Sequence, residues 1–300
     1  MAEKGRVIAL GFFDGVHIGH KALLDRVNER AAEHGLIPSV INFDTHPDSL
    51  VFNRTVGLIY DNEKRIEIIN KEFGISDIIM IHFDRAMMET PWDEFLSLLL
   101  EKHFLRWVVI GYDFRFGWKG LGTPDKVSDF CRNNGLGFDL IPAVEKDGET
   151  VSSTIIRRCI TRGEMEKAEA LLGRPYSVSG KILHGRKVGT RIGYPTINLK
   201  ISEKISVPSF GVYATETLVK GNKYHSITNI GIRPTFYTNS EITMETNLFD
   251  YSENLYEENA EIFFYKKIRG EKKFSSPEEL TVQISKDVAE VRRFFAENGN

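Results

Sequence analysis

Two histidines lie three residues apart in the segment GFFDGVHIGH, where an apolar, strand-like run changes into a helix-like one. Residues i and i+3 share a helix face, so His17 and His20 are expected to lie side by side. Gly11, Gly15 and Gly19 permit tight turns and a close approach of backbone N–H groups, and a helix N-terminus attracts anions. Imidazoles placed there could donate hydrogen bonds to a polyphosphate and stabilise charge on a transferring α-phosphate. A zinc site is the weaker interpretation, because the His-Glu-x-x-His pattern is absent.

Two further loops follow predicted strands, at the edge where open α/β sheets bind ligands. FDTHPDS offers His46 and Pro47. GYDFRFGWKGLGT carries Asp113, Trp118 and Lys119, a mixture able to hold an adenosine or a flavin ring. Each loop also has an ordinary structural interpretation, as a turn or as part of the core. Their shared position at one sheet edge favours the ligand site.

A third loop, VSSTIIRR, begins a predicted helix. Ser152 or Ser153 is the expected N-cap, and Arg157 follows one turn later, so hydroxyls and a guanidinium could bind the β- and γ-phosphates of a nucleotide. Plain helix capping is the alternative.

The second half contains a basic, glycine-rich stretch, HGRKVGTRIGYPTINL, which suits an anionic ligand. It is not a Walker P-loop, because Gly180-x4-Gly185 is followed by Arg-Lys and no helix is predicted after it. Thr196 and Asn198 are expected on the same strand face, where a hydroxyl and an amide carbonyl could bind Mg²⁺. An ordinary strand start with a proline at its edge is the alternative.

The elements that position these residues follow from hydrophobic periodicity. The first half alternates short apolar runs with amphipathic stretches, which predicts a Rossmann-like α/β domain with a parallel sheet. The expected strands cover residues 6–13, 38–44, 76–84, 106–114 and 136–144, and the expected helices cover 17–35, 61–74, 91–104, 123–135, 152–163 and 164–173.

From Tyr176 onward the pattern changes to β-type segments separated by Gly, Pro and Asn, which favours an antiparallel sandwich or barrel. A closing helix is predicted with Ser276 as N-cap, Pro277 at its first position and Glu279 completing a capping box. Its apolar stripe is expected to cover the barrel, and comprises Leu280, Ile284, Val288, Val291 and Phe295. The segment 171–176 is the predicted boundary between domains 1–172 and 176–300.

Composition excludes several classes of protein. With 41% hydrophobic and 27% charged residues and a mean hydropathy of −0.25, the chain is too apolar for disorder. A net charge of −3 argues against a dedicated nucleic-acid binder. No membrane-spanning run or signal-peptide core is evident, so a cytoplasmic location is expected. Cys131 and Cys159 are too few for a disulfide framework and are expected to be free, inert thiols.

GFFDGVHIGH, FDTHP, GYDFRFG and SSTIIR, in this order, resemble the adenylyltransferase half of prokaryotic FAD synthetases, the bifunctional riboflavin kinase/FMN adenylyltransferases. The resemblance implies transfer of AMP from ATP to FMN, giving FAD and pyrophosphate. Thr45 and Ile155 depart from the family, which usually has Pro and Arg at these positions, and this affects the expected flavin contacts. The implied ATP site comprises Gly11, Phe12, Asp14, Gly15, His17, Gly19, His20, Asp113, Ser153, Thr154 and Arg157, and the implied flavin site comprises His46, Pro47 and Asp113.

GYPTINL, PSFGVY, NIGIRPTF and METNLFDYSENLY resemble the riboflavin kinase domain of the same family, a Greek-key β-barrel with a covering helix. The resemblance implies that Thr196 and Asn198 bind Mg²⁺ and the ATP phosphates. It also implies that Glu245 is the general base for the riboflavin 5′-hydroxyl. An exposed strand charge is the alternative for Glu245, because other acidic residues crowd the region. The implied kinase ATP site comprises Gly185, Lys187, Gly193, Thr196 and Asn198.

This half also departs from the family. Asn247 replaces the usual His, and Glu257 replaces a Gly. A glutamate tolerates positive φ poorly, so the loop after Tyr256 is expected to differ from the family's.

The sequence therefore predicts a bifunctional, Mg²⁺-dependent enzyme that makes FMN from riboflavin and FAD from FMN, with ATP as the other substrate. A narrower hypothesis is an FMN adenylyltransferase whose barrel has lost kinase activity. A third is a flavin-binding or regulatory protein without ATP turnover, against which the intact His17, His20 and Arg157 argue. Small-molecule partners are expected, without nucleic acid or membrane, and the oligomeric state is left open.

Overall fold

The computed structural model describes residues 4–51, 57–183, 194–233, 241–251 and 254–299. The chain divides into two compact units, Met1–Ser153 and Thr154–Asn300. The helices of the chain give way to strands between α8 (Met165–Leu172) and β8 (Tyr176–Leu183), within the second unit. The domain limits proposed from the sequence, 1–172 and 176–300, remain a prediction.

The first unit contains a parallel five-stranded sheet in the order β3-β2-β1-β4-β5. The chain leaves β1 in one direction to form β2 and β3 and later returns to the other side to form β4 and β5. The gap between β1 and β4 is therefore the switch point, outside which open α/β sheets bind ligands. The strands are β1 (Arg6–Leu10), β2 (Ile37–Phe43), β3 (Asp77–Ile81), β4 (Leu105–Gly111) and β5 (Gly137–Ile141).

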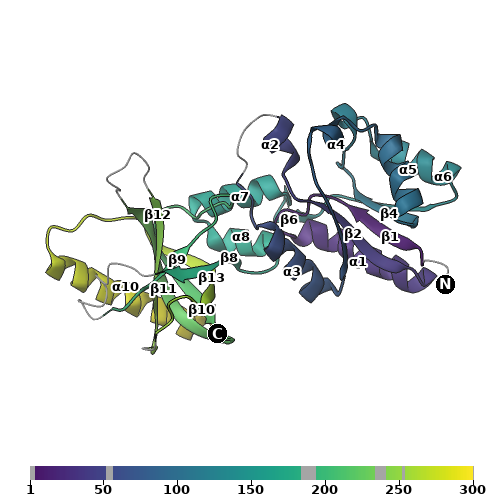
Figure 1. Ribbon diagram of the computed structural model, residues 1–300. Coiled ribbons are helices and arrows are strands. Elements are labelled where there is room, and N and C mark those ends of the chain that lie inside the picture. The colour runs from purple at the N-terminus through teal and green to yellow at the C-terminus, as the bar shows by residue number, and fades with distance from the viewer. Residues whose placement is uncertain (1–3, 52–56, 184–193, 234–240, 252–253, 300) are drawn as a thin grey trace. The chain divides into compact units, whose positions relative to one another are not determined.

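Helices cover both faces of this sheet, with α1 and α3 on one side and α5 and α6 on the other (Figure 1). All four were expected, and Gly35 and Gly74 end α1 and α3 in the left-handed conformation, at φ 64° and 67°. Two short helices, α2 and α4, were not expected. The helices are α1 (Ile18–His34), α2 (Pro47–Val51), α3 (Asn62–Phe73), α4 (Arg85–Glu89), α5 (Trp92–Lys102) and α6 (Pro124–Asn133).

The predicted strands were too long at their carboxyl ends. The run 6–13 is a strand only to Leu10, because Phe13 has a positive φ of 51° and cannot continue a ladder. The run 136–144 ends at Ile141, and a small hairpin follows, formed by β6 (Glu145–Lys146) and β7 (Glu149–Thr150). The apolar residues beyond each strand are therefore loop residues at the ligand-binding edge.

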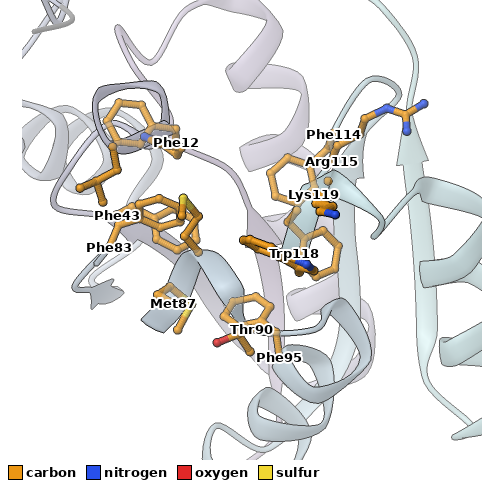
Figure 2. Close-up of a pocket in the computed structure, with 16 residues that line it drawn as sticks. Phe12, Phe43, Phe83, Met87, Thr90, Phe95, Phe114, Arg115, Trp118 and Lys119 are labelled. Atoms are coloured by element: carbon orange, nitrogen blue, oxygen red, sulfur yellow. The ribbon is translucent and has the colours of Figure 1, made fainter. Parts of the chain in front are cut away.

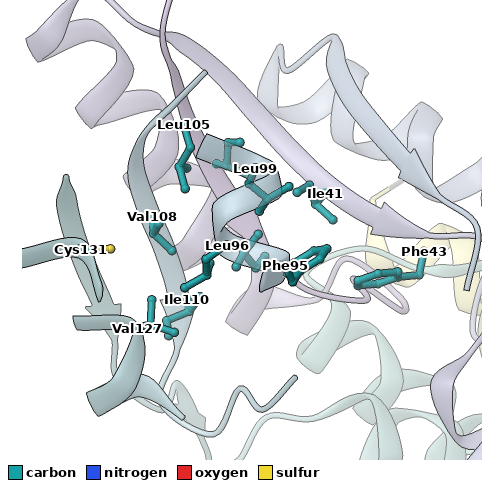
Figure 3. Close-up of a cluster of buried hydrophobic side chains, with 12 residues drawn as sticks. Ile41, Phe43, Phe95, Leu96, Leu99, Leu105, Val108, Ile110, Val127 and Cys131 are labelled. Carbon is teal, nitrogen blue, oxygen red and sulfur yellow. The ribbon is translucent and has the colours of Figure 1, made fainter. Parts of the chain in front are cut away.

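A hydrophobic cluster fills the space between the sheet and α5 and α6 (Figure 3). Leu96, Leu99 and Val108 are fully buried in it, and Cys131 packs at its border. Burial raises the pKa of the Cys131 thiol to about 11 and also raises that of Cys159. Both cysteines are buried and free, as expected, and neither is a thiolate at neutral pH.

Asp139 on β5 is an ionic anchor of the first unit. It accepts hydrogen bonds from Arg26 Nη1 at 3.0 Å, Arg30 Nε at 2.8 Å and Trp107 Nε1 at 2.7 Å. Burial opposes ionisation, but the hydrogen bonds from Arg30 and Trp107 outweigh it, so the pKa of Asp139 lies below its ordinary value.

Replacing Asp139 with asparagine is expected to lower the free energy of unfolding at pH 7 by about 2 kcal/mol. A carboxyl with a depressed pKa stabilises the fold above its unfolded pKa, and this contribution is lost as the pH falls through the folded value. The difference from the wild type should therefore shrink between pH 7 and pH 3 in urea titrations followed by circular dichroism. Asp129→Asn is the control, because Asp129 is 64% exposed. A difference that is independent of pH would contradict the assignment.

The second unit contains a closed six-stranded antiparallel barrel in the order β10-β11-β12-β9-β8-β13. The sequence predicted either an antiparallel sandwich or a barrel. Because the strand pairing closes on itself, the fold is a barrel. α7 (Ser153–Arg162) and α8 precede it, as predicted. The remaining strands are β9 (Ile197–Lys200), β10 (Gly211–Val219), β11 (Asn222–Arg233), β12 (Glu241–Leu248) and β13 (Asn259–Arg269).

Helix α10 (Pro277–Asn298) covers the outer face of the barrel. Val291 and Phe295 pack against Val212 and Ile227, which confirms the predicted stripe. Ser276 Oγ accepts a hydrogen bond from the Glu279 N–H at 3.2 Å, as an N-cap should. The expected capping box is displaced by one residue, because the Glu279 carboxylate accepts from the backbone N–H of Ser275 at 3.0 Å.

Glu257 adopts a positive φ of 69°, the conformation that a glycine would supply. Its carboxylate forms an ion pair with Lys181 at 2.5 Å, and its N–H donates to the Ile182 carbonyl at 3.1 Å. Contacts with β8 hold the turn in this conformation, which a glutamate adopts at a cost. That the loop differs from the family's remains a prediction.

In the part of the chain that the structure describes, no helix is long and apolar enough to cross a membrane.

Candidate functional site

The loop between β1 and α1 is strained and tightly anchored. Phe13 and Val16 both have positive φ, 51° and 43°, which is unusual for a β-branched residue such as valine. The Asp14 carboxylate is buried and accepts from the Ile59 N–H at 2.8 Å, while Ser153 Oγ donates to the Asp14 carbonyl at 2.9 Å. Asp14 and Ser153 thus fix the loop that presents the histidines at the switch point.

The two histidines form a stacked pair at the start of α1. Their ring centroids are 3.7 Å apart at an interplanar angle of 16°, as the three-residue spacing predicts. His17 is the N-cap, and its Nδ1 accepts from the His20 N–H at 3.3 Å. A His17 ring that accepts through Nδ1 has its other ring nitrogen, Nε2, as the position for a donated proton. A side chain at Gly19 would meet the His17 ring at 3.0 Å.

Arg65 on α3 is a fully buried cation behind this loop. It donates to the Phe12 carbonyl, to Asn42 Oδ1 at 2.7 Å and to the Phe43 carbonyl at 3.0 Å. Its guanidinium also lies 4.3 Å from the centroid of the Phe12 ring. Burial lowers the pKa of Arg65 to about 10, so the group stays charged at neutral pH. Arg65 therefore holds the ends of β1 and β2 together, a role that the sequence alone did not reveal.

An aromatic pocket of about 640 Å³ lies beside the loop. Figure 2 shows Phe12, Phe43 and Phe83 on one side of it and Phe114 and Trp118 on the other. Its size suits a small ligand, and its lining is mostly apolar, as expected for a planar organic molecule. The other lining residues are Pro47, Leu50, Met87, Met88, Thr90, Phe95, Arg115, Phe116, Gly117, Lys119 and Gly120.

The turn that carries Trp118 is held in place by contacts with Thr90 and Trp92. The Trp118 N–H donates to the Thr90 carbonyl at 2.9 Å, and a side chain at Gly117, where φ is 72°, would meet the backbone of Trp92 at 2.7 Å. The Trp118 ring remains 38% exposed. A large ring on a fixed turn is thus available to a ligand in the pocket.

The remaining predicted residues of the first site lie at different distances from the pocket. Pro47 lines it, and His46 contacts the Phe12 ring edge-on with centroids 4.6 Å apart. Asp113 is exposed in the turn after β4 and is not among the lining residues. Thr154 and Arg157 belong to the second compact unit, on the first turn of α7, where Arg157 Nη2 donates to Thr154 Oγ1 at 3.4 Å. Their part in the site remains a prediction.

A second pocket, of about 310 Å³, lies on the outer face of the barrel beneath α10. Strand register places Glu245 of β12 directly between Asn198 of β9 and Asn229 of β11. Glu245 and Asn229 line the pocket together with Thr196 and Asn247. The two residues of the predicted metal site and the predicted base therefore share one sheet face. Gly185, Lys187 and Gly193 lie outside the described residues.

A buried ion pair holds α10 over this pocket. Asp287, which is 3% exposed, accepts from Arg269 Nε at 2.9 Å and pairs with Arg269 Nη2 at 2.8 Å. Gln283 Nε2 adds a hydrogen bond to Asp287 at 2.8 Å. The position of the helix, and with it the apolar wall formed by Leu280 and Ile284, is thus fixed against β13.

Several lining residues were missed from the sequence. Asp44 holds Phe83 in the aromatic wall by accepting from its N–H at 3.0 Å, and it pairs with His82 Nδ1 at 2.6 Å. The sequence did contain a signal for this aromatic wall. Phe43 and Phe83 each lie at or just beyond the carboxyl end of a strand, where open α/β sheets bind ligands. Nothing comparable marks Asn229, whose position depends on strand register.

The fold and the two pockets define a two-part protein, with a parallel α/β unit of the nucleotide-binding type and a separate antiparallel barrel. A family model described as FAD synthetase matches residues 1–155, and one described as riboflavin kinase matches residues 172–295.

Curated relatives agree over nearly the whole chain. Bifunctional riboflavin kinase/FMN adenylyltransferase of Listeria monocytogenes is 35% identical, with 97% of this chain and 93% of the relative covered. The enzyme of the same description from Escherichia coli is 33% identical, with 98% and 94% covered. A solved structure described as a macrolide-efflux protein from Streptococcus pneumoniae is 27% identical, with a TM-score of 0.89 over 97% of this chain and 95% of that one. The chain belongs to the bifunctional riboflavin kinase/FMN adenylyltransferase family.

Proposed function

We propose that this chain makes FAD in two steps at two separate sites. In the barrel, the 5′-hydroxyl oxygen of riboflavin forms a bond to the γ-phosphorus of ATP, the bond from γ-phosphorus to ADP breaks, and FMN results. In the α/β unit, a phosphate oxygen of FMN bonds to the α-phosphorus of a second ATP and pyrophosphate leaves. The observation that carries the proposal is that Phe12 belongs both to the histidine-bearing loop and to the wall of the aromatic pocket.

In the α/β unit, His17 and His20 donate hydrogen bonds to phosphate oxygens at the α1 N-terminus, where the helix dipole also favours negative charge. A side chain at Gly11 would meet the Phe13 ring and one at Gly19 the His17 ring, and Gly15 has a positive φ of 84°, so these glycines allow the loop its shape. The FMN ring occupies the aromatic pocket between Phe12 and Trp118. The flavin is thereby oriented so that its phosphate reaches the histidines.

In the barrel, Glu245 accepts the proton of the riboflavin hydroxyl, and the flavin ring lies against the apolar wall of α10. Thr196 and Asn198 suit Mg²⁺, because they offer a hydroxyl and an amide oxygen on one face beside Glu245. Among the described residues there is no group of three or more His, Cys, Asp or Glu side chains that could hold a metal ion. Thr196 and Asn198 would hold Mg²⁺ together with oxygens of the ATP phosphates. Bound Mg²⁺ neutralises charge on the phosphate oxygens.

The test is to incubate the protein with ATP and Mg²⁺ and to separate the flavins by chromatography. Riboflavin alone should give FMN and then FAD, and FMN alone should give FAD. FAD from FMN but nothing from riboflavin would indicate the narrower adenylyltransferase. Flavin binding without any product would indicate a binding or regulatory protein. The cytoplasmic location and the absence of nucleic-acid and membrane partners remain predictions from the sequence.

Replacing Trp118 with leucine is expected to raise the KM for FMN about tenfold, because ring stacking contributes on the order of 1–1.5 kcal/mol. The KM for ATP and the rate of riboflavin phosphorylation should stay within about twofold of the wild type. Initial rates of FAD formation check this, and Trp118→Phe should retain most of the affinity. Leu121→Ala is the control, since Leu121 is 50% exposed in the same turn and does not line the pocket. An unchanged KM for FMN would place the flavin elsewhere.

A further inference from the structure

Asn247 lies where two strands of the barrel stop pairing. The β9–β12 ladder runs through Glu245 opposite Asn198 and ends at Thr246 opposite Ile197. Before Ile197 the chain contains Pro195, which has no N–H to offer a ladder. The Asn247 side chain is 9% exposed, and its Nδ2 donates to the Pro195 carbonyl at 2.6 Å. A side chain thus continues the connection between the strands beyond the last backbone pair.

The held segment carries a residue of the proposed metal site. Thr196 follows Pro195 directly and lines the same pocket as Asn247 and Glu245. Register places Asn247 beside Thr196, two residues along each strand from the Glu245–Asn198 pair. Two residues before Thr196, the Tyr194 hydroxyl lies 2.9 Å from Ser285 Oγ of α10. The segment 194–196 is therefore fixed at two points, one on β12 and one on the covering helix.

We propose that Asn247 is a positioning residue of the kinase site, which holds Pro195 by its carbonyl and thereby sets the Thr196 hydroxyl beside Glu245. The inference rests on the proposed function. The inference explains how an asparagine can serve where the family usually has a histidine, because its amide N–H donates the hydrogen bond that the Pro195 carbonyl accepts. Asn247 therefore supports kinase activity in this chain and does not mark its loss.

Replacing Asn247 with alanine removes the donor without adding charge, and so tests the proposal. We expect the KM for MgATP in riboflavin phosphorylation to rise about tenfold, the size of one lost hydrogen bond. The KM for riboflavin should stay within about twofold, and so should FAD formation from FMN in the other unit. Asn247→His keeps a donor and should recover most of the affinity for MgATP. Asn222→Ala is the matched control, because the Asn222 amide also donates to a carbonyl, that of Lys220, in an exposed turn of the barrel.

A double-mutant cycle with Thr196 separates positioning from a general structural effect. If Asn247 acts through Thr196, then Asn247→Ala should change the KM for MgATP less than twofold in a Thr196→Ala background. Thermal unfolding of each variant shows whether the barrel stays folded. If Asn247→Ala does not fold, Asn247→Ser serves in its place, since its shorter hydroxyl cannot reach the Pro195 carbonyl.

The outcomes are distinguishable. Equal MgATP KM values for the wild type and Asn247→Ala would overturn the inference and leave the proposed function standing. Additive effects in the cycle, or a rise in the riboflavin KM alone, would also overturn it. A wild-type protein that makes FAD from FMN but no FMN from riboflavin would refute the kinase assignment, and this inference with it.

Discussion

Replacing His20 with alanine is expected to lower FAD formation from FMN by about 10²- to 10³-fold, the usual effect of removing one donor from a preorganised anion site. His20 stacks on His17 at 3.7 Å at the start of α1, so in the proposed mechanism the two imidazoles act on the same phosphate group. Riboflavin phosphorylation should stay within about twofold of the wild type, because the barrel pocket shares no residue with this site. Single-turnover rates with FMN and with riboflavin measure the two effects separately.

His34→Ala is the control for this variant. His34 lies in the last turn of the same helix, 46% exposed, and stacks on Trp107 away from the lining residues. Its replacement should change neither activity. Loss of both activities in a folded His20→Ala protein would refute the two-site assignment. Full adenylyl transfer by the variant would show that His20 takes no part in stabilising the phosphate.

Replacing Glu245 with glutamine is expected to have the reverse effect. The substitution keeps the size and hydrogen-bonding capacity of the side chain but removes the base, so riboflavin phosphorylation should fall about 10²- to 10⁴-fold. FAD formation from supplied FMN should not change. The KM for riboflavin should also change little, because the pocket walls from β11, β12 and α10 remain in place.

Glu258→Gln tests the ordinary interpretation of Glu245 as one acidic charge among many. Glu258 is exposed and forms a long ion pair with Lys220 at 3.8 Å. If the two glutamine variants lower kinase activity equally, the effect comes from the net charge of the region. A Glu245→Gln protein with wild-type kinase rates would remove Glu245 from the role of base.

The helices and their ends could be predicted closely, because they depend on local signals. Gly35 and Gly74 end α1 and α3 as expected, and Ser276 caps α10. Strand ends were less predictable. Phe12 and Phe13 continue the apolar run of β1 but belong to the loop, since the strained backbone after Leu10 is held by contacts with Ile59 and Arg65.

The candidate sites show the same division. The stacking of His17 on His20 depends on three-residue spacing in one helix turn and could be predicted. The aromatic pocket could be predicted only in part, because its walls come from segments between residues 12 and 120. Arg65 is a buried cation on a helix that otherwise has an ordinary amphipathic pattern, and nothing local distinguishes it from a surface arginine.

By itself, the sequence determined that this protein has a parallel α/β half and a β half, a histidine pair at a helix start and a Thr-x-Asn segment on one strand face. These features follow from residue periodicity and short spacing, which the backbone geometry of helices and strands converts directly into shared faces. Only the tertiary structure decided that Glu245 lies between Asn198 and Asn229 and that Asn247 holds Pro195. Strand register and side-chain contacts over long sequence distances depend on how the whole barrel closes, and a shift of one residue would turn these side chains to the opposite face.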